Sequence, residues 1–239
     1  MSTANAIALS SQIIVMRQMD VIANNLANAS TTAFKGEHPL FTEYLAQAAG
    51  ADSSSYVQDA GTARDLSQGP ITKTSNPLDL ALEGDGYFAV STPAGVRYTR
   101  DGKLQLNAQG QITTAQGYAL LDPNNNPIFV PSDAGNISVA QDGTISTSEG
   151  VDGRLQVSTF ANPRALAPAA NGLYVTTQQA QPATSATVAQ GYLEQANIQP
   201  IVEITHLMAA EHSVVFDKDY TNSEATRISN AIDRLGKTV

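Results

Sequence analysis

The side chains best suited to metal binding or proton transfer in this chain are its three histidines, His38, His206 and His212. The last two lie in a stretch with a helical pattern. Six residues turn a helix through roughly 600°, so these two side chains point about 120° apart. That geometry is poor for a shared metal ion, and the zinc-protease spacing is absent. The histidines are therefore predicted to be surface or interface residues.

Oxygen-bearing side chains alternate between Asp122 and Asn126, as they do in a calcium-binding loop. Pro127, however, occupies the position at which such a loop needs glycine for its sharp turn. The segment Gly84-Asp85-Gly86 lacks the third glycine and the helix of a dinucleotide site. We therefore predict an ordinary loop at Asp122, no metal site and no cofactor.

Three acidic residues are the only candidates for catalysis, and the sequence around them offers little support for that role. Asp79, Glu83 and Asp85 lie close in sequence, and the last two could share one face of a strand. A glycan hydrolase acting on cell-wall material would need such a pair of carboxylates. Nothing around them forms a complete catalytic set, so we predict that the chain is not an enzyme and keep the hydrolase as an alternative.

Composition narrows the class of protein. The chain has 239 residues, no cysteine, no tryptophan and a formal charge of −9. The acidic balance argues against nucleic acid as a partner, and the lack of cysteine excludes disulfides and thiol chemistry. The N-terminus lacks the pattern of a cleaved secretory signal. The apolar run from Ile13 to Met16 is too short to span a membrane.

The two ends of the chain share a pattern that the middle lacks. Residues from about Thr3 to Asn28 and from about Pro200 to Leu235 carry apolar residues at helical spacing. We expect both segments to form long helices that pair as an antiparallel coiled-coil stalk, with a break between Asp217 and Glu224 as an alternative. Much of both ends is expected to be disordered in the isolated monomer. Such a stalk leaves apolar surface that neighbouring subunits would cover.

The middle of the chain has the pattern of an antiparallel β domain. Short apolar runs alternate with Asp-Gly and Asn-Gly pairs, which favour tight turns. One hairpin is predicted to join residues 96–100 to 103–107 across Asp101-Gly102. A second is predicted to pair Ile137 and Val139 with Ile145 across Asp142-Gly143.

The predicted fold class is therefore α+β, with a central antiparallel all-β domain between the two terminal helices. The predicted organisation, in chain order, is an N-terminal helix over 1–34, an extended connecting segment over 35–75 with a mobile link at 49–55, a β domain over 76–188 and a C-terminal helix over 189–239.

Three stretches of the sequence resemble the signatures of bacterial flagellar rod and hook proteins. They are MDVIANNLANASTTAFK at 19–35, PLDLALEGDGYF at 77–88 followed by YTRDG at 98–102, and GYLEQANIQP at 191–200. They occur in the order typical of that family and span nearly the whole chain. A compact chain with a short connection before the β domain most resembles the proximal-rod members. Distal-rod members, which carry a longer insertion, are the alternative.

The resemblance implies a structural subunit of the basal-body rod that polymerises with copies of itself and with other rod proteins. It also implies export by the flagellar type III apparatus without a cleaved signal peptide, and assembly in the periplasm. A free-standing adhesin or chaperone-like coiled-coil module would fit the helices but not the three ordered signatures. One departure concerns Ala33, because the family usually has glycine before the phenylalanine; if that position needs positive φ, alanine strains it.

Apolar residues of the two terminal stripes and amides of the signatures form the predicted subunit interface. In particular, Asn24, Asn25 and Asn28 are expected to form hydrogen bonds across subunit junctions and to fix the register between them. The predicted interface residues are Val15, Met19, Ile22, Asn24, Asn25, Leu26, Asn28, Phe34, Asn197, Ile204, Met208, Val215, Ile228 and Ile232.

Overall fold

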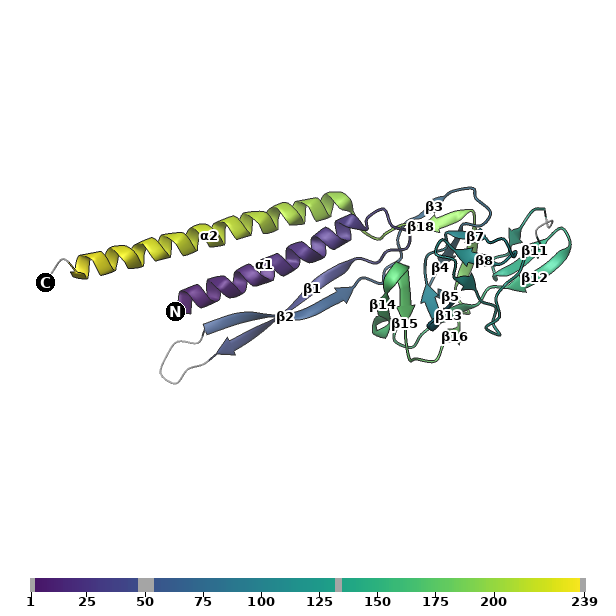
Figure 1. Ribbon diagram of the computed structural model, residues 1–239, viewed down its shortest axis with the longest axis horizontal. Helices are drawn as coiled ribbons and strands as arrows, with labels where there is room; N and C mark the ends of the chain where they lie inside the picture. Colours follow the sequence, from purple (N-terminus) through teal and green to yellow (C-terminus); the bar gives the residue numbers. More distant parts are fainter. Residues whose placement is uncertain (1–2, 47–53, 132–134, 237–239) are drawn as a thin grey trace. The chain divides into compact units, whose positions relative to one another are not determined.

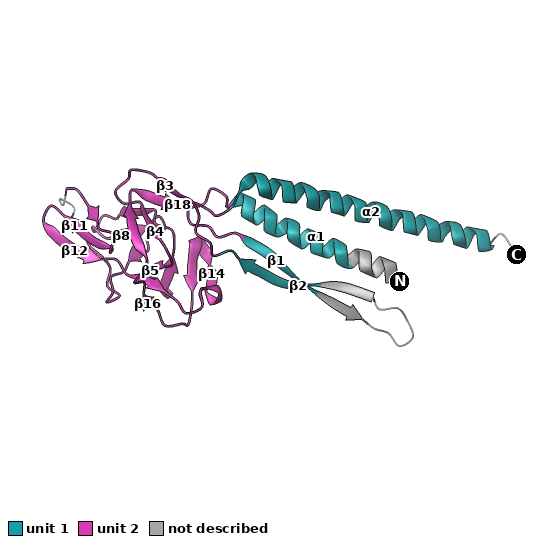
Figure 2. Ribbon diagram, turned by 180° about the vertical axis from the view of Figure 1, so that it is seen from behind, with its two compact units in different colours: residues 1–27, 37–65, 198–239 teal, residues 28–36, 66–197 magenta. Residues whose placement is uncertain are grey.

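The computed structural model describes the backbone of residues 3–46, 54–131 and 135–236, and the side chains of residues 10–42, 58–131 and 135–236. The chain divides into two compact units (Figure 2). Residues 1–27, 37–65 and 198–239 form what we call the helical unit, and residues 28–36 and 66–197 form the β unit. The segment predicted as a mobile link, 49–55, lies almost wholly outside the described residues.

The helical unit contains two helices and one β-hairpin. Helix α1 (Thr3–Ala27) lies between helix α2 (Pro200–Gly236) and the hairpin of β1 (Glu37–Ala46) and β2 (Ser54–Arg64) (Figure 1). The hairpin is antiparallel, and its register shifts between Leu40 and Phe41. The extended connecting segment predicted over 35–75 thus holds a hairpin in its first part.

Sequence signals explain the limits of α2. Pro200 occupies the first turn, where a missing N–H costs nothing, and Glu203 adds negative charge near the helix N-terminus. Arg234 lies in the last turn and Gly236 ends the helix. The helix is continuous from Pro200 to Gly236, so the break considered between Asp217 and Glu224 does not occur.

The predicted coiled-coil stalk is wrong. The two helices do run side by side, but α1 also packs against a hairpin that the sequence pattern did not reveal. The side of α2 nearest α1 carries Leu207 and Val214, but Glu203, Ala210 and Asp217 occupy positions that a heptad seam gives to large apolar residues. Helix α2 has 37 residues against 25 in α1, and most of its last 20 residues are exposed.

The β unit is built from short antiparallel strands. Its largest sheet has nine strands, in the order β14-β15-β6-β5-β9-β8-β7, with β13 and β16 attached through β5. The strands of this sheet are β5 (Tyr87–Thr92), β6 (Gly95–Thr99), β7 (Leu104–Leu106), β8 (Ile112–Thr114), β9 (Ala119–Leu120), β13 (Val157–Thr159), β14 (Ala167–Ala169), β15 (Leu173–Val175) and β16 (Gln181–Pro182).

Smaller sheets join early and late parts of the sequence. Strand β3 pairs with β18, β4 pairs with β17, and β10, β11 and β12 form a separate three-stranded sheet. Two 3₁₀ turns, Pro163–Ala165 and Ala170–Gly172, flank β14. The bounds of the remaining strands are β3 (Ile71–Lys73), β4 (Leu80–Glu83), β10 (Ser138–Val139), β11 (Thr144–Thr147), β12 (Gly150–Arg154), β17 (Thr187–Gln190) and β18 (Tyr192–Glu194).

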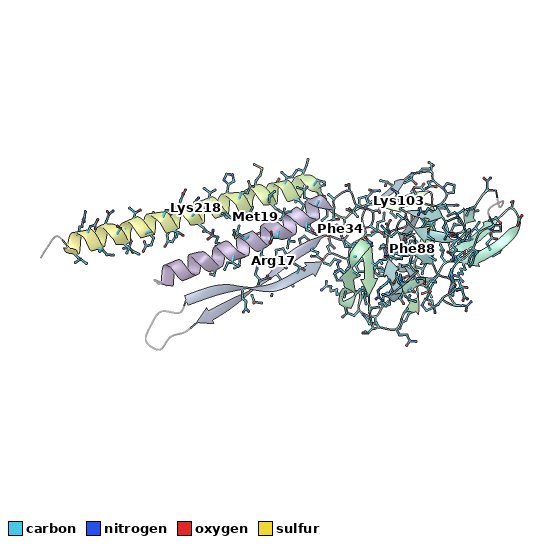
Figure 3. All side chains as sticks on the ribbon, in the orientation of Figure 1. Arg17, Met19, Phe34, Phe88, Lys103 and Lys218 are labelled. Carbon is cyan, nitrogen blue, oxygen red and sulfur yellow. The ribbon has the colours of Figure 1, made fainter. Side chains whose placement is uncertain are left out.

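One apolar core fills the β unit. Phe88, labelled in Figure 3, is fully buried with Leu82, Val90 and Ile145 around it. A second cluster consists of aromatic rings, in which Tyr87 contacts Phe160 and Tyr174 with ring centroids 6.0 and 5.5 Å apart. These clusters give the unit a core of its own.

Of the two predicted hairpins, one is confirmed and one is wrong. Val139 pairs with Ile145 across Asp142-Gly143, as predicted, whereas Ile137 precedes β10 and takes no part in its pairing with β11. Strands β6 and β7 do not pair across Asp101-Gly102, since β6 pairs with β5 and β15 whereas β7 pairs with β8. Instead, the carbonyl of Gly102 accepts a hydrogen bond from the N–H of Leu80 at 2.9 Å. A Cβ at position 102 would lie 1.6 Å from the carbonyl oxygen of Leu80, so this glycine is required by close backbone approach.

Candidate functional site

The first signature continues past α1 into a tight turn that belongs to the β unit. The N–H of Thr31 donates to the carbonyl of Asn28 at 2.9 Å, and the N–H of Phe34 donates to the carbonyl of Thr31 at 3.3 Å. Ala33 has φ +55° and is 6% exposed. The alanine therefore does occupy a left-handed position, where glycine would be unstrained.

Three charged side chains from three distant segments meet inside the β unit. The Nζ of Lys35 lies 2.6 Å from Oε1 of Glu194, and the Nε of Arg100 lies 2.6 Å from Oε2 of the same carboxylate. The exposed fractions of the three side chains are 4%, 6% and 1% for Lys35, Arg100 and Glu194. We call Lys35, Arg100 and Glu194 the ion cluster.

The hydrogen bonds around the ion cluster satisfy both cations. Lys35 Nζ also donates to the carbonyl of Ser67 at 2.7 Å. The guanidinium of Arg100 donates to the carbonyls of Gly86 at 2.8 Å and Gly84 at 2.7 Å. The N–H of Gly69 adds a third donor to Glu194, at 3.0 Å from Oε1. A buried ion cluster is tolerable only with such complete pairing.

Backbone contacts hold the first and third signatures together beside the ion cluster. The N–H of Ala33 donates to the carbonyl of Glu194 at 2.9 Å, and the N–H of Asn197 donates to the carbonyl of Phe34 at 3.2 Å. The side-chain oxygen of Asn197 accepts from the N–H of Gly36 at 2.8 Å. Because each signature supplies one ionic partner, the ion cluster couples segments that are remote in sequence.

Asn25 plays a comparable part within the helical unit. Its side chain is 1% exposed; its oxygen accepts from the N–H of Glu37 at 2.9 Å, and its nitrogen donates to the carbonyl of Glu37 at 2.8 Å. The same nitrogen lies 3.4 Å from Oε2 of Glu203. Asn25 therefore joins α1 to the start of β1 and to the first turn of α2.

One ion pair and one hydrogen bond between side chains add to this packing. Arg17 projects from α1 toward the hairpin (Figure 3), and its Nε lies 3.3 Å from Oδ2 of Asp59. The hydroxyl of Ser11 donates to Oδ2 of Asp217 at 3.1 Å. These contacts are half-exposed, so they contribute about 0–1 kcal/mol each.

Several large apolar residues are exposed on the other side of α2. Ile201, Ile204, Met208 and Val215 lie within an arc of about 60°. Their exposed fractions are 79%, 44%, 55% and 57%. We call these four residues the outer stripe. A patch of this kind marks an interaction surface.

The predicted interface residues fall into three groups. Ile22 and Asn25 are buried. Half-buried members are Val15, Met19, Leu26, Asn28, Phe34 and Asn197. Exposed members are Asn24, Ile204, Met208, Val215, Ile228 and Ile232. The structure thus assigns Asn25 and Asn197 hydrogen bonds inside their own units.

The functional residues that sequence reasoning missed are Lys35, Arg100 and Glu194. All three lie within the three signatures. A charged residue in a segment made mostly of small, amide and apolar residues could have indicated a buried ionic contact. Their pairing could not be predicted from spacing, because Lys35 and Glu194 are 159 positions apart and only the fold brings them together.

The carboxylates of the hydrolase alternative have unlike surroundings. Asp79 is 5% exposed and accepts a hydrogen bond from Asn76 at 3.0 Å, whereas Glu83 and Asp85 are exposed. Asp122 binds its own loop, since its Oδ1 accepts from the N–H groups of Asn124 and Asn126, both at 2.8 Å. In the described part of the chain, no group of three or more acidic or histidine side chains is placed to hold a metal ion.

Neither described helix is sufficiently long and apolar to cross a bilayer.

Comparison with known proteins identifies the family. Residues 7–35 match the family described as flagella basal body rod protein, and residues 81–147 match the D1 domain of the flagellar hook protein FlgE/F/G family. The chain is 36% identical to the flagellar basal-body rod protein FlgF of Caulobacter vibrioides, over 99% of both chains. It is 29% identical to FlgF of Mesorhizobium japonicum over 96% of both chains, and 31% identical to the basal-body rod protein FlgG of Bacillus subtilis over 81% of this chain and 84% of that one.

In the sequence, the two matched segments flank the β1–β2 hairpin, and the first of them ends at Lys35, a member of the ion cluster. The similarity to a rod protein extends over nearly the whole chain, and all three signatures that carry it meet at the ion cluster. The chain belongs to the family of flagellar basal-body rod proteins and is a structural subunit of the rod.

Proposed function

We propose that the chain is a proximal-rod subunit that polymerises, with copies of itself and with other rod proteins, through its terminal helices. The outer stripe on α2 carries this proposal, because four large apolar side chains there are 44–79% exposed. Covering them would supply about 25 cal/mol for each Å² of apolar surface removed from water. The remaining members of the predicted interface stay part of the proposal.

The coverage of the relatives supports the proximal position. The FlgF relative of Caulobacter vibrioides aligns over 99% of its length, whereas the FlgG relative of the same organism aligns over 85% of its own. A distal-rod subunit is the alternative. No catalytic step is proposed, because the outer stripe and the ion cluster provide binding and folding rather than chemistry.

Export and location belong to the same proposal. A rod subunit would pass through the flagellar type III apparatus without a cleaved signal peptide and assemble in the periplasm. Long terminal helices suit that route, since helices of this length depend on packing for their stability and can stay unfolded until they dock.

A substitution on the outer stripe tests polymerisation. Met208→Asp places a charge on the stripe, on the side of α2 away from Glu203, so the monomer should fold normally while rods fail to form. Val151→Asp is the matched control, because Val151 is an exposed apolar residue, 74% exposed, in the β unit. Motility and the amount of each variant in purified basal bodies are the measurements. Normal incorporation of Met208→Asp would contradict the proposal.

The position along the rod needs a separate experiment. Deleting the gene for this chain should also remove the FlgG-type protein from purified basal bodies, because a distal segment needs the proximal one beneath it. Mass spectrometry of the purified particles measures this. If the FlgG-type protein stayed at normal abundance, the proposed proximal position would be wrong.

A further inference from the structure

The two helices of the helical unit run in a fixed antiparallel register. Asn25 contacts Glu203, and Ser11 contacts Asp217. From the first contact to the second, the chain goes back 14 residues on α1, from Asn25 to Ser11, and forward 14 residues on α2, from Glu203 to Asp217. Fourteen residues of helix span about 21 Å. At this register Thr3, the first residue of α1, lies level with position 225, so α2 continues beyond the beginning of α1.

The side of α2 that faces α1 has a regular spacing. Its inward residues are Glu203, Leu207, Ala210, Val214 and Asp217, all buried or half-buried. After the polar residues Thr221 and Glu224, and past the level at which α1 begins, Ile228, Ile232 and Leu235 lie on the same side of α2. These three and the five inward residues lie within an arc of about 80°.

The three residues past the beginning of α1 are open. Ile228, Ile232 and Leu235 are 37%, 63% and 73% exposed. We call these three residues the apolar overhang. It continues the side of α2 that faces α1, and it lies beyond the level of Thr3, the first residue of α1. A helix with the character of α1 is therefore the occupant that this face is built to accept.

A matching surface lies on α1. Ile13 and Met16 are 58% and 54% exposed, and they lie roughly 120° to 180° around the helix from Ser11 and Asn25. This side is turned away from α2, so the chain's own overhang cannot reach it. Position 212 of α2 is level with Met16, and Ile232 lies 20 residues further, about 30 Å along the axis.

We propose that the apolar overhang of one copy binds the Ile13–Met16 surface of a second copy. This inference rests on the proposed polymerisation and names its contact. The two surfaces differ and lie at different levels of the helical unit, so the contact is heterologous and repeats from copy to copy, as a filament requires. Pairing of two overhangs would instead give a closed dimer and leave Ile13 and Met16 uncovered.

Cysteine cross-linking in assembled rods tests the contact, because the chain has no cysteine of its own. The protein carrying both Met16→Cys and Ile232→Cys should form disulfide-linked dimers and larger species on mild oxidation of purified basal bodies. Each single variant should stay monomeric. Ile13→Cys with Ile228→Cys is a second pair, in case the first disturbs assembly.

A matched control uses Phe216, which is 71% exposed and lies on the other side of α2. Met16→Cys with Phe216→Cys should give no cross-link. Dimers formed by Ile232→Cys alone, cross-linking of the Phe216 pair, or no cross-link from either overhang pair in assembled rods would each overturn the inference. If Met208→Asp blocks assembly and the overhang pairs stay uncross-linked, only this contact is wrong; if Met208→Asp assembles normally, the proposed polymerisation fails first.

Discussion

Lys35 and Glu194, separated by 159 residues of sequence, form an ion pair 2.6 Å long whose two side chains are no more than 4% exposed. Lys35 directly follows the turn after α1, and Glu194 ends the last strand of the β unit. The folded β unit therefore depends on residues near both ends of its own part of the sequence.

Removing the carboxylate of the ion cluster should destabilise the β unit strongly. Glu194→Gln would leave Lys35 and Arg100 as two buried cations without a counter-charge, which costs about 3–5 kcal/mol of unfolding free energy. Lys35→Met should cost less, because Glu194 keeps its partner Arg100. Urea unfolding followed by near-ultraviolet circular dichroism of the eight tyrosines measures both. The exposed Glu149→Gln should change stability by no more than about 0.5 kcal/mol; a similar effect for Glu194→Gln would show that the ion cluster is not needed.

Asn25→Ala should destabilise the helical unit. It would remove both hydrogen bonds to the backbone of Glu37, which is half-buried, and an unpaired backbone group that is shielded from water costs about 1–3 kcal/mol. Hydrogen exchange at the N–H of Glu37 reports the loss directly, as faster exchange than in the unmodified chain. Asn222→Ala, an exposed change on α2, is the control and should leave that N–H protected. Unaltered protection in Asn25→Ala would contradict the role given to this amide.

Ala33 provides a test of backbone strain. Its φ of +55° is tolerated by alanine at a cost of about 1–2 kcal/mol, and a β-branched side chain would tolerate it less. Ala33→Val should therefore lower the unfolding free energy by about 2 kcal/mol or more. Ala33→Gly should stay within about 1 kcal/mol, because relief of strain offsets the greater entropy of the unfolded chain. At Ala189, in strand β17, the same change to valine should be tolerated; equal losses at both positions would rule out strain as the cause.

Gly102 tests the close approach that replaces the predicted hairpin. Gly102→Ala would force the new methyl group against the backbone of Leu80, with no flexible side chain to yield, so a loss of about 4 kcal/mol or more is expected. Gly117→Ala is the comparison, because nothing lies within 4 Å of a Cβ there and only its φ of +84° is unfavourable. Thermal unfolding distinguishes the two. A mild effect at position 102 would mean that β4 and Gly102 are not in contact.

Asp122 should titrate below the ordinary range of an aspartate. Hydrogen bonds from the N–H groups of Asn126 and Asn124 lower the pKa of its carboxyl group. The charged form is the one that is stabilised, so its contribution to loop stability is present above the ordinary pKa of about 3.9 and is lost as the pH falls through the lower folded value. Carboxyl-carbon NMR should place the midpoint of Asp122 below that of the same residue in urea-unfolded chain. A midpoint at or above the unfolded one would exclude these hydrogen bonds.

Elements determined by residues close together in the sequence could be predicted, whereas contacts between distant residues could not. Helices α1 and α2 follow from local spacing and from end signals such as Pro200 and Gly236, and the hairpin of Val139 and Ile145 follows from the turn between them. The coiled-coil stalk failed because the hairpin β1–β2 competes for the surface of α1, and its strands carry no regular apolar alternation around His38 and Pro39.

The second failure has the same cause. Asp101-Gly102 has the residue types of a hairpin turn, but Gly102 serves a close contact with Leu80, more than 20 residues earlier. Long-range pairings of this kind leave no periodic trace. The ion cluster shows it most clearly, since each of its members looks like an ordinary surface charge until the fold brings them together.

The β unit cannot be completed until its last two strands are present, because β3 pairs with β18 and β4 pairs with β17. Their late partners, together with Glu194, are the last parts of this unit to leave the ribosome. Throughout most of translation Lys35 and Arg100 thus have no acidic partner, and the first strands have open edges. The β unit therefore completes its sheets and its ion cluster only after nearly all of its own sequence has been synthesised.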